Sequence, residues 1–431
     1  MIEQGDPTIA TAKIISRPDH NISRANISEA ALKVLYRLKK SGYQAHLVGG
    51  GVRDLLLGRE PKDFDVATDA TPEQVKAAFG NARIIGRRFR LVHVRFGREI
   101  IEVATFRSMQ FQQEKHSEEG MVLRDNEFGT IEEDALRRDF TVNALYYNIA
   151  DFSVIDYSNG IEDLENGLLR LLGDPETRYR EDPVRMLRAI RFAAKLGFNI
   201  EQSTEEPITR LAHLIGDVPS ARLYEEVLKL FISGCAVSAF EKLRHYDLFA
   251  QLFPQTEEAL THEDHEFPLV LVLKGLENTD ERLAQDKPVT PAFLFAVLLW
   301  EPLRLIAQEL EAEGMPSYQA LQCAGNKVVE EQVRCVAIPR RFSTPMREIW
   351  TLQARFHNTK GKRPLRLLTH PRFRAAYDFL LLRAESGEAD PELAAWWTKF
   401  QEQQGLDPKG GGNKPAGNRR RRRRPRKRPA K

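Results

Sequence analysis

Cysteine is scarce in this sequence: among 431 residues there are three, Cys235, Cys323 and Cys335. Their number is odd and no two have Cys-x-x-Cys spacing, which argues against a disulfide framework and against a zinc site. We therefore expect reduced thiols in a cytoplasmic protein.

Long apolar runs are also missing. The first residues contain no apolar signal-peptide core. The longest apolar run, from Pro291 to Trp300, is too short to cross a bilayer and predicts a buried helix. We expect no transmembrane segment.

Acidic residues are absent from the end of the chain. Residues 409–431 contain twelve Lys or Arg and no acid, whereas the whole chain has a net charge of +3, so residues 1–408 carry −9. The run Arg419–Arg428 is too highly charged to fold. We expect a disordered tail that contacts RNA or a membrane surface, and an inert solubilising tail is the alternative.

A strand-to-helix corner lies near the N-terminus. The apolar run Ala45–Val48 predicts a strand, three glycines follow it, and Val52–Leu57 predicts the first turns of a helix. Free N–H groups at a helix N-terminus attract phosphate, and glycine allows a close approach. The spacing fits neither a dinucleotide-binding G-x-G-x-x-G nor a P-loop. We assign Gly49, Gly50 and, in the helix, Arg53 to nucleotide binding.

An acidic strand pattern follows at Asp63–Val66. Side chains alternate across a strand, so Asp63 and Asp65 are expected to point the same way while Phe64 points into the core. Two carboxylates beside a phosphate-binding corner form a hard-oxygen site, and we expect both to bind Mg²⁺. For either piece alone, a tight turn or a solvated acidic strand is the alternative.

Together, the corner and the acidic pair resemble motif A of the class II nucleotidyltransferases in the DNA polymerase beta superfamily. This group contains the tRNA CCA-adding enzymes and the bacterial poly(A) polymerases. The segment Arg137–Ala144 resembles motif B, which implies that Asp139 is the third active-site carboxylate and that Arg138 binds the triphosphate. From the residues alone, an Arg–Asp surface pair is the alternative. Glu102, an acid inside the apolar strand pattern 100–103, is the second candidate for the third carboxylate.

The segment Glu181–Arg188 resembles motif D. Pro183 suits the first helical position, so Asp182 is the expected N-cap, with Arg185 three residues further on. The resemblance implies that Asp182 and Arg185 contact the edge of the incoming base and that Arg188 reaches the triphosphate. Plain helix capping with an Asp182–Arg185 ion pair is the alternative.

The resemblance to bacterial poly(A) polymerases extends from about residue 18 to about residue 400 and includes the basic tail, although the loop 110–120 is shorter than in the family. It implies template-independent addition of AMP from ATP to RNA 3′ ends with two Mg²⁺ ions, which marks RNA for decay. It also makes the RNA-degradation machinery a candidate partner of the tail. CCA addition to tRNA and a non-catalytic RNA-binding adaptor are the two alternatives.

The expected architecture is α+β with an all-helical second part, and we expect a monomer. The predicted parts are a flexible arm (1–24), a nucleotidyltransferase head with a small mixed sheet (25–175), a helical neck that binds nucleotide and RNA (176–245), an all-helical C-terminal RNA-binding domain (246–402) and a disordered Arg-rich tail (403–431). Hydrophobic periodicity predicts helices at 28–40, 71–79, 182–196, 206–214, 220–233, 237–246, 291–313, 316–336, 341–356 and 372–386. Strands rich in Val and Ile are expected at 82–85, 91–96 and 99–106.

Two polar clusters receive no role. Gly86–Arg90 is a basic turn that suits a triphosphate or an RNA base as well as it suits a solvated hairpin. His262–Glu266 lacks the spacing of a zinc site and suits a solvated loop.

Overall fold

The computed structural model describes residues 12–86, 90–108, 128–261 and 267–408. Contacts divide the chain into two compact units, Met1–Pro254 and Gln255–Lys431. Several predicted segments lie outside the described residues: the start of the arm, the centre of the Gly86–Arg90 turn, the loop 110–120, the cluster His262–Glu266 and the basic tail from residue 409 onward.

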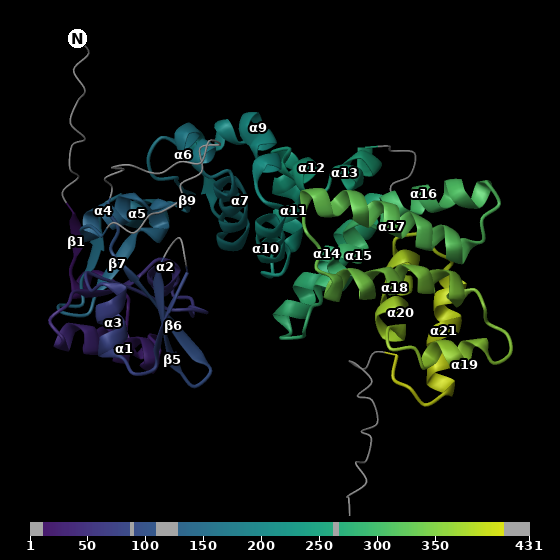
Figure 1. Cartoon of the computed structure of the whole chain (residues 1–431), viewed down its shortest axis with the longest axis horizontal. Coiled ribbons are helices and arrows are strands. Elements are labelled where there is room, and N and C mark those ends of the chain that lie inside the picture. The colour runs from purple at the N-terminus through teal and green to yellow at the C-terminus, as the bar shows by residue number, and fades with distance from the viewer. Residues whose placement is uncertain (1–11, 87–89, 109–127, 262–266, 409–431) are drawn as a thin grey trace, which may run out of the picture. The chain divides into compact units, whose positions relative to one another are not determined.

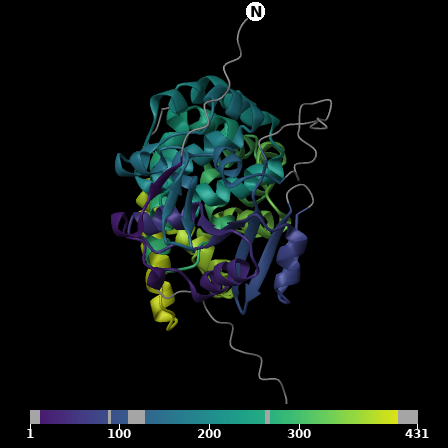
Figure 2. The same cartoon turned by 90° about the vertical axis from the view of Figure 1, so that its left-hand side faces the viewer.

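The first unit is built on a mixed sheet (Figures 1 and 2). Eight strands of the described residues take the order β1-β8-β7-β2-β3-β6-β5-β4. All neighbours are antiparallel except β3 and β6, which are parallel. The strands are β1 (Lys13–Ile15), β2 (Ala45–Val48), β3 (Asp65–Thr68), β4 (Ala82–Ile85), β5 (Leu91–Phe96), β6 (Glu99–Thr105), β7 (Leu145–Asn148) and β8 (Val154–Asp156). This sheet confirms the predicted α+β head.

Two capped helices, α1 (Glu29–Lys40) and α3 (Pro72–Ala78), pack on one face of the sheet. The Ser28 hydroxyl accepts a hydrogen bond from the third N–H of α1 at 3.1 Å, and Thr71 and Gln74 form a capping box at the start of α3. The apolar stripes of both helices share a core with Val66 and Val103 of the central strands. Both helices were predicted from these local signals.

The other face of the sheet is covered by α4 (Ile131–Leu136), which packs on Phe106 and Tyr146. His46 of β2 also lies on this face. It is 4% exposed, and its ring centroid lies 6.0 Å from that of Phe106 and 6.2 Å from that of Tyr146. Burial lowers the pKa of His46 to about 4, so the imidazole is neutral near pH 7.

Short helices complete the first unit. They are α2 (Gly50–Leu56), α5 (Gly160–Glu165), α6 (Pro175–Glu181), α7 (Val184–Leu196), α8 (Gln202–Glu205), α9 (Pro207–Leu211), α10 (Ser220–Phe231), α11 (Ala236–His245) and α12 (Leu248–Leu252). A two-stranded parallel sheet joins β9 (Leu168–Leu169) to β10 (Asn199–Ile200). The buried face of α7 contacts α10 and α11, so it belongs to the same compact unit as the large sheet.

The described part of the second unit contains helices and connecting loops but no strand. Its helices, the first of which begins one residue before the boundary, are α13 (Pro254–Thr261), α14 (Phe267–Ala284), α15 (Pro291–Leu298), α16 (Trp300–Ala312), α17 (Ser317–Cys335), α18 (Arg340–Phe356), α19 (Arg363–Leu368), α20 (Phe373–Glu385) and α21 (Pro391–Gln403). Part of its core is aromatic, with Phe356, Phe373, Tyr377 and Trp397 in contact. None of the helices described in either unit is both long and apolar enough to span a membrane.

One predicted helix of the second unit is two helices in the structure. The segment 291–313 breaks at Leu299, whose N–H donates back to the carbonyl oxygen of Phe295 at 3.1 Å and so closes α15. Pro302 lies in the first turn of α16, where a missing N–H costs little. The continuous apolar run therefore contains a break between two helices, which the apolar pattern does not show.

Candidate active site

The glycine corner joins β2 to α2. Gly49 is the N-cap of α2, with φ 69° and ψ −138°, a conformation that glycine adopts far more readily than other residues. A Cβ on Gly49 would lie 3.4 Å from Nη1 of Arg138, and a Cβ on Gly51 would lie 3.5 Å from the carbonyl oxygen of Asp63. The corner therefore lies between the motif B arginine and the acidic segment. The helix begins at Gly50, two residues earlier than predicted, because two of the glycines form its first turn.

The acidic pair lies at the start of β3. The strand begins at Asp65, so the predicted strand 63–66 is wrong by two residues and Asp63 precedes the strand. Both carboxylates are exposed, and Phe64 between them is 9% exposed and joins the core. In the parallel pairing of β3 with β6, Asp65 is opposite Glu102. Paired residues of neighbouring strands point to the same face of a sheet, so Glu102 lies beside Asp65.

Negative charge is concentrated at these residues. Partial desolvation of the carboxylate by the surrounding protein and repulsion from Glu102 raise the pKa of Asp65 to about 6. The positive charge of Arg138 opposes this rise only in part. In the described parts of the chain, no Lys or Arg forms an ion pair with Asp63 or Asp65. Nε2 of His93 lies 3.4 Å from the carboxylate of Glu102.

These acids suit a divalent cation whose remaining ligands come from the substrate. In the described part of the chain, no three His, Cys, Asp or Glu side chains converge closely enough to hold an ion by themselves. Mg²⁺ typically uses one or two carboxylates and takes its other ligands from water and phosphate. The hard oxygens of Asp63, Asp65 and Glu102, which form no ion pair with a described Lys or Arg, match that requirement.

Arg138 is held by a buried polar group beneath the corner. Its Nε donates to the hydroxyl of Tyr146 at 2.9 Å and its Nη2 donates to Asp134 at 3.1 Å. The Tyr146 hydroxyl in turn donates to Asp134 at 2.6 Å. These bonds orient the guanidinium, while its Nη1 remains next to Gly49.

Asp139 lies in a different environment from the acidic pair. It forms an ion pair with Arg188 of α7, and its Oδ1 accepts a hydrogen bond from the N–H of Phe140 at 2.9 Å. Burial alone would raise the pKa of Asp139, but Arg188 and this N–H outweigh it and lower the pKa. Glu102, the second candidate for the third carboxylate, lies opposite Asp65 in the pairing of β3 with β6 and contributes to its raised pKa.

Arg53 is buried, and its guanidinium has protein partners. It is 2% exposed, and its guanidinium donates to Asp54 at 2.7 Å and to Asn143 at 2.6 Å. A Cβ on Gly50 would lie 3.4 Å from its Nη2. Arg53 therefore supports the glycine corner, and its contact with a nucleotide stays a prediction.

The ion pair that is the alternative interpretation of motif D is absent. The Asp182–Arg185 ion pair is not formed, because Asp182 pairs with Arg222 at 2.7 Å and Arg185 pairs with Glu181 at 3.0 Å. Arg185 also donates to the carbonyl oxygen of Arg178 at 2.5 Å. The helix α7 starts one residue later than predicted, although the Asp182 carboxylate still accepts its first N–H at 3.3 Å.

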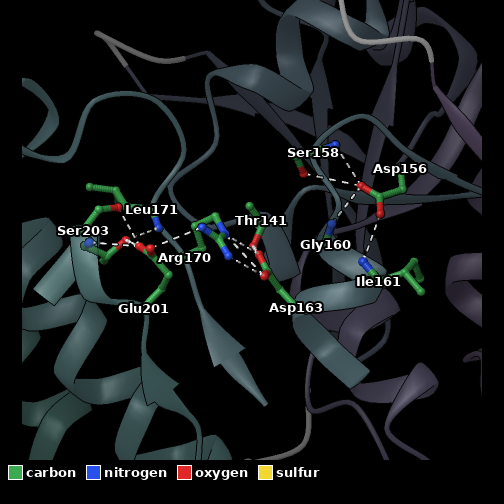
Figure 3. A network of polar contacts seen from close by, with 11 residues as sticks. Thr141, Asp156, Ser158, Gly160, Ile161, Asp163, Arg170, Leu171, Glu201 and Ser203 are labelled. Carbon is green, nitrogen blue, oxygen red and sulfur yellow. Dashed lines mark hydrogen bonds and ion pairs between the residues drawn. The ribbon is translucent and has the colours of Figure 1, made fainter. Parts of the chain in front are cut away.

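A polar network behind motif B fixes the backbone of that segment (Figure 3). Arg170 contacts Oδ2 of Asp163 through Nε at 3.1 Å and forms an ion pair with Glu201 through Nη1 at 3.3 Å. The hydroxyl of Thr141 donates to Asp163 at 2.7 Å, and its N–H donates to the carbonyl oxygen of Arg170 at 3.0 Å. No local pattern links these four positions, so the network could not be predicted from the sequence.

The start of α5 packs closely against the same segment. The carboxylate of Asp156 accepts hydrogen bonds from the N–H groups of Gly160 and Ile161 at 3.1 and 2.9 Å (Figure 3). A Cβ on Gly160 would overlap the carbonyl oxygen of Thr141. The turn before α5 is therefore a second support of motif B.

A mixed sheet with an acidic pair at a glycine corner, and an arginine of motif B against that corner, defines a nucleotidyltransferase. Poly(A) polymerase I of Salmonella typhimurium is 53% identical to this protein, over 96% of this chain and 92% of its own. The chain belongs to the poly(A) polymerase family.

Three family models match in succession. They are the Poly A polymerase head domain at residues 45–170, the "Probable RNA and SrmB- binding site of polymerase A" at 197–260, and the Polymerase A arginine-rich C-terminus at 313–428. The CCA-adding enzyme of Lactobacillus helveticus is more distant, at 36% identity over 58% of this chain and 64% of its own. The solved structure of the Bacillus stearothermophilus CCA-adding enzyme in complex with CTP matches with a TM-score of 0.59 and 26% identity, and covers 88% of this chain and 82% of its own.

Proposed function

We propose that this protein is a polynucleotide adenylyltransferase that adds AMP from ATP to RNA 3′ ends without a template. The observation that carries this proposal is the group formed by Asp63, Asp65 and Glu102 beside the glycine corner, which is negatively charged and is balanced by no ion pair from a described Lys or Arg. A non-catalytic RNA-binding adaptor would have no use for such a repulsive arrangement, because it lowers stability.

Asp63, Asp65 and Glu102 hold divalent ions in this proposal, with Mg²⁺ the expected ion and two ions the expected number. Such ions lower the pKa of an attacking hydroxyl and neutralise charge on a leaving pyrophosphate. Glu102 replaces Asp139 as the third carboxylate, because Glu102 is paired in register with Asp65. Asp139 instead holds Arg188, and the pair orients that guanidinium toward the nucleotide.

The corner and the arginines bind the triphosphate and the base. Gly49 allows phosphate oxygens to approach Arg138, whose guanidinium is already oriented by Asp134 and Tyr146. Arg185 is fixed by Glu181 and a backbone carbonyl, so its remaining N–H groups can donate to ring nitrogens of adenine. Asp182 forms an ion pair with Arg222. Its carboxylate can accept a hydrogen bond from the exocyclic amine of adenine only while it also contacts Arg222.

The relatives support adenylation over CCA addition. The match to a poly(A) polymerase I covers nearly the whole chain at 53% identity, whereas the match to a CCA-adding enzyme covers 58% of it at 36%. RNA as the acceptor is supported by the matched RNA-binding model at residues 197–260.

The test is nucleotide incorporation with one nucleotide at a time. The purified full-length protein is incubated with Mg²⁺ and either a generic RNA or a tRNA that lacks its CCA end. We expect long tails from ATP on both RNAs and none without Mg²⁺. Incorporation of CTP confined to the truncated tRNA would instead indicate CCA addition, and no Mg²⁺-dependent use of ATP would indicate an adaptor.

A further inference from the structure

One row of polar side chains crosses four neighbouring strands, from the acidic pair outward. The register places Asp65 of β3 opposite Glu102 of β6. It continues with Glu102 opposite His93 of β5, and with His93 opposite Arg83 of β4. Paired residues of neighbouring strands point to the same face of a sheet, so the whole row lies on one face. Strands are about 4.8 Å apart, so the row is about 14 Å long.

The charge changes sign along this row. It begins with the two acids, passes through His93, whose Nε2 lies 3.4 Å from the Glu102 carboxylate, and ends with Arg83. Arg83 is exposed, and within the described chain it forms no ion pair. Its positive charge can therefore bind an anion that reaches this end of the row.

Two further side chains widen the basic end of the row. Arg95 of β5 is opposite Ile100 of β6, and each is two residues away from a member of the row on its own strand. Side chains two apart on a strand share a face. Arg95 is exposed and forms no ion pair with a described residue, and Ile100 is 49% exposed although it is large and apolar. We call Arg83, His93, Arg95 and Ile100 the β4–β6 patch.

The order of the strands indicates which ligand this patch receives. Strand β2, which leads into the glycine corner, lies on one side of β3, and β6, β5 and β4 lie on the other side. In the proposed function the glycine corner holds the triphosphate, so pyrophosphate leaves on the β2 side. The attacking and leaving oxygens of a phosphoryl transfer lie roughly in line, on opposite sides of the phosphorus. The RNA 3′-hydroxyl therefore approaches from the side of β6 and β5.

We propose that the β4–β6 patch binds the 3′ end of the single-stranded acceptor RNA. Arg83 and Arg95 bind its last phosphodiester groups, because guanidinium N–H donors match phosphate oxygens. Ile100 removes apolar surface of a terminal base from water. This inference rests on the proposed function, because that function determines the side on which pyrophosphate leaves.

The first test is photo-crosslinking with the full-length wild type. The probe is a short oligo(A) that carries 4-thiouridine either at its last position or near its 5′ end. After irradiation without ATP, the crosslinked peptides are identified by mass spectrometry. We expect the 3′-terminal probe to attach to β4, β5 or β6 and the 5′ probe to attach elsewhere. Attachment of the 3′-terminal probe only outside these strands would overturn the inference.

The second test separates the KM for RNA from the KM for ATP. Arg83→Gln and Arg95→Gln should each raise the KM for RNA about threefold or more and leave the KM for ATP unchanged, because each removes one exposed phosphate contact. Each should also make RNA affinity less dependent on salt, since one phosphate fewer is neutralised. Lys76→Gln is the matched control, because it removes an exposed positive charge from α3, on the opposite face of the sheet, and should change neither KM.

The proposed function and this inference fail separately. A normal KM for RNA in both arginine variants of an enzyme that incorporates AMP would refute the inference alone, and so would a rise confined to the KM for ATP. If the wild type incorporated no AMP, but the 3′-terminal probe still attached to these strands and Arg83→Gln weakened that attachment, the proposed function would fall and the RNA site would stand.

Discussion

Asp65→Asn should abolish activity and, at the same time, stabilise the metal-free protein. Partial desolvation and repulsion from Glu102 raise the pKa of Asp65 to about 6, so the ionised carboxylate is unfavourable in the folded state. Asparagine has nearly the same shape and no charge, so it removes the repulsion and leaves the packing at the start of β3 intact. Loss of activity and gain of stability therefore have one cause.

The magnitude follows from the pKa shift. A rise from 3.8 to about 6 corresponds to about 3 kcal/mol, at about 1.4 kcal/mol per unit. Because Asp65 is exposed, solvent screening reduces this to about 1 kcal/mol. In the unfolded state Asp65 ionises near its ordinary pKa. The loss of folding stability caused by its ionisation is therefore absent below about pH 4, grows as the pH rises, and is complete above about pH 6.

Urea unfolding of the two proteins in EDTA measures this difference. We expect the Asn variant to be about 1 kcal/mol more stable at pH 7.5 and to lose much of this advantage by pH 5. Glu99→Gln, an exposed acid at the start of the neighbouring strand β6, is the control and should change stability by less than about 0.5 kcal/mol. Added Mg²⁺ should stabilise the wild type more than the variant.

Two outcomes would refute this reasoning. One is an Asn variant that is less stable than the wild type in EDTA at pH 7.5, because Asp65 would then make favourable contacts. The other is a gain that is the same at pH 4.5 as at pH 7.5, because the effect would then not come from ionisation.

Three further predictions concern other parts of the first unit. Asp63→Ala should lower the rate of AMP incorporation by several orders of magnitude, and a variant with more than about a tenth of wild-type activity would contradict the metal assignment. Gly160→Ala should lower the thermal midpoint by several degrees, because its Cβ overlaps the carbonyl oxygen of Thr141, whereas Gly80→Ala, with no atom within 4 Å, should not. Because the pKa of His46 is lowered to about 4, the wild type should lose up to about 3 kcal/mol relative to His46→Phe between pH 6.5 and pH 4, and equal pH dependence in urea unfolding would contradict this.

Local chemistry made much of the fold predictable. The caps at Ser28 and Thr71 mark helix starts through bonds that span three residues, and the Val-rich and Ile-rich strands follow from composition. The acidic pair was also found locally, although the start of β3 was placed two residues too early, because alternation alone does not show where pairing begins.

The rest depends on contacts that no short pattern contains. Glu102 becomes a partner of Asp65 only because β3 and β6 run parallel, and their pairing is fixed by the whole sheet. Likewise, Asp182 pairs with Arg222, forty residues away, instead of the nearby Arg185 that helical spacing suggested. The glycine corner and the acidic segment are thus visible in the sequence, whereas the partners of Asp65 and Asp182 are not.

The network around Arg170 has a consequence for how the catalytic part can be exchanged between relatives. The N–H of Leu172 donates to the carbonyl oxygen of Asp139 at 2.9 Å, and the N–H of Leu171 donates to Thr204 at 3.0 Å. A fragment cut after Arg170 would lose Leu171 and Leu172, which pair with the backbone of motif B at Phe140 and Asp139. A chimera that is to keep its activity should therefore be joined beyond Thr204, so that the turn and its support come from the same parent.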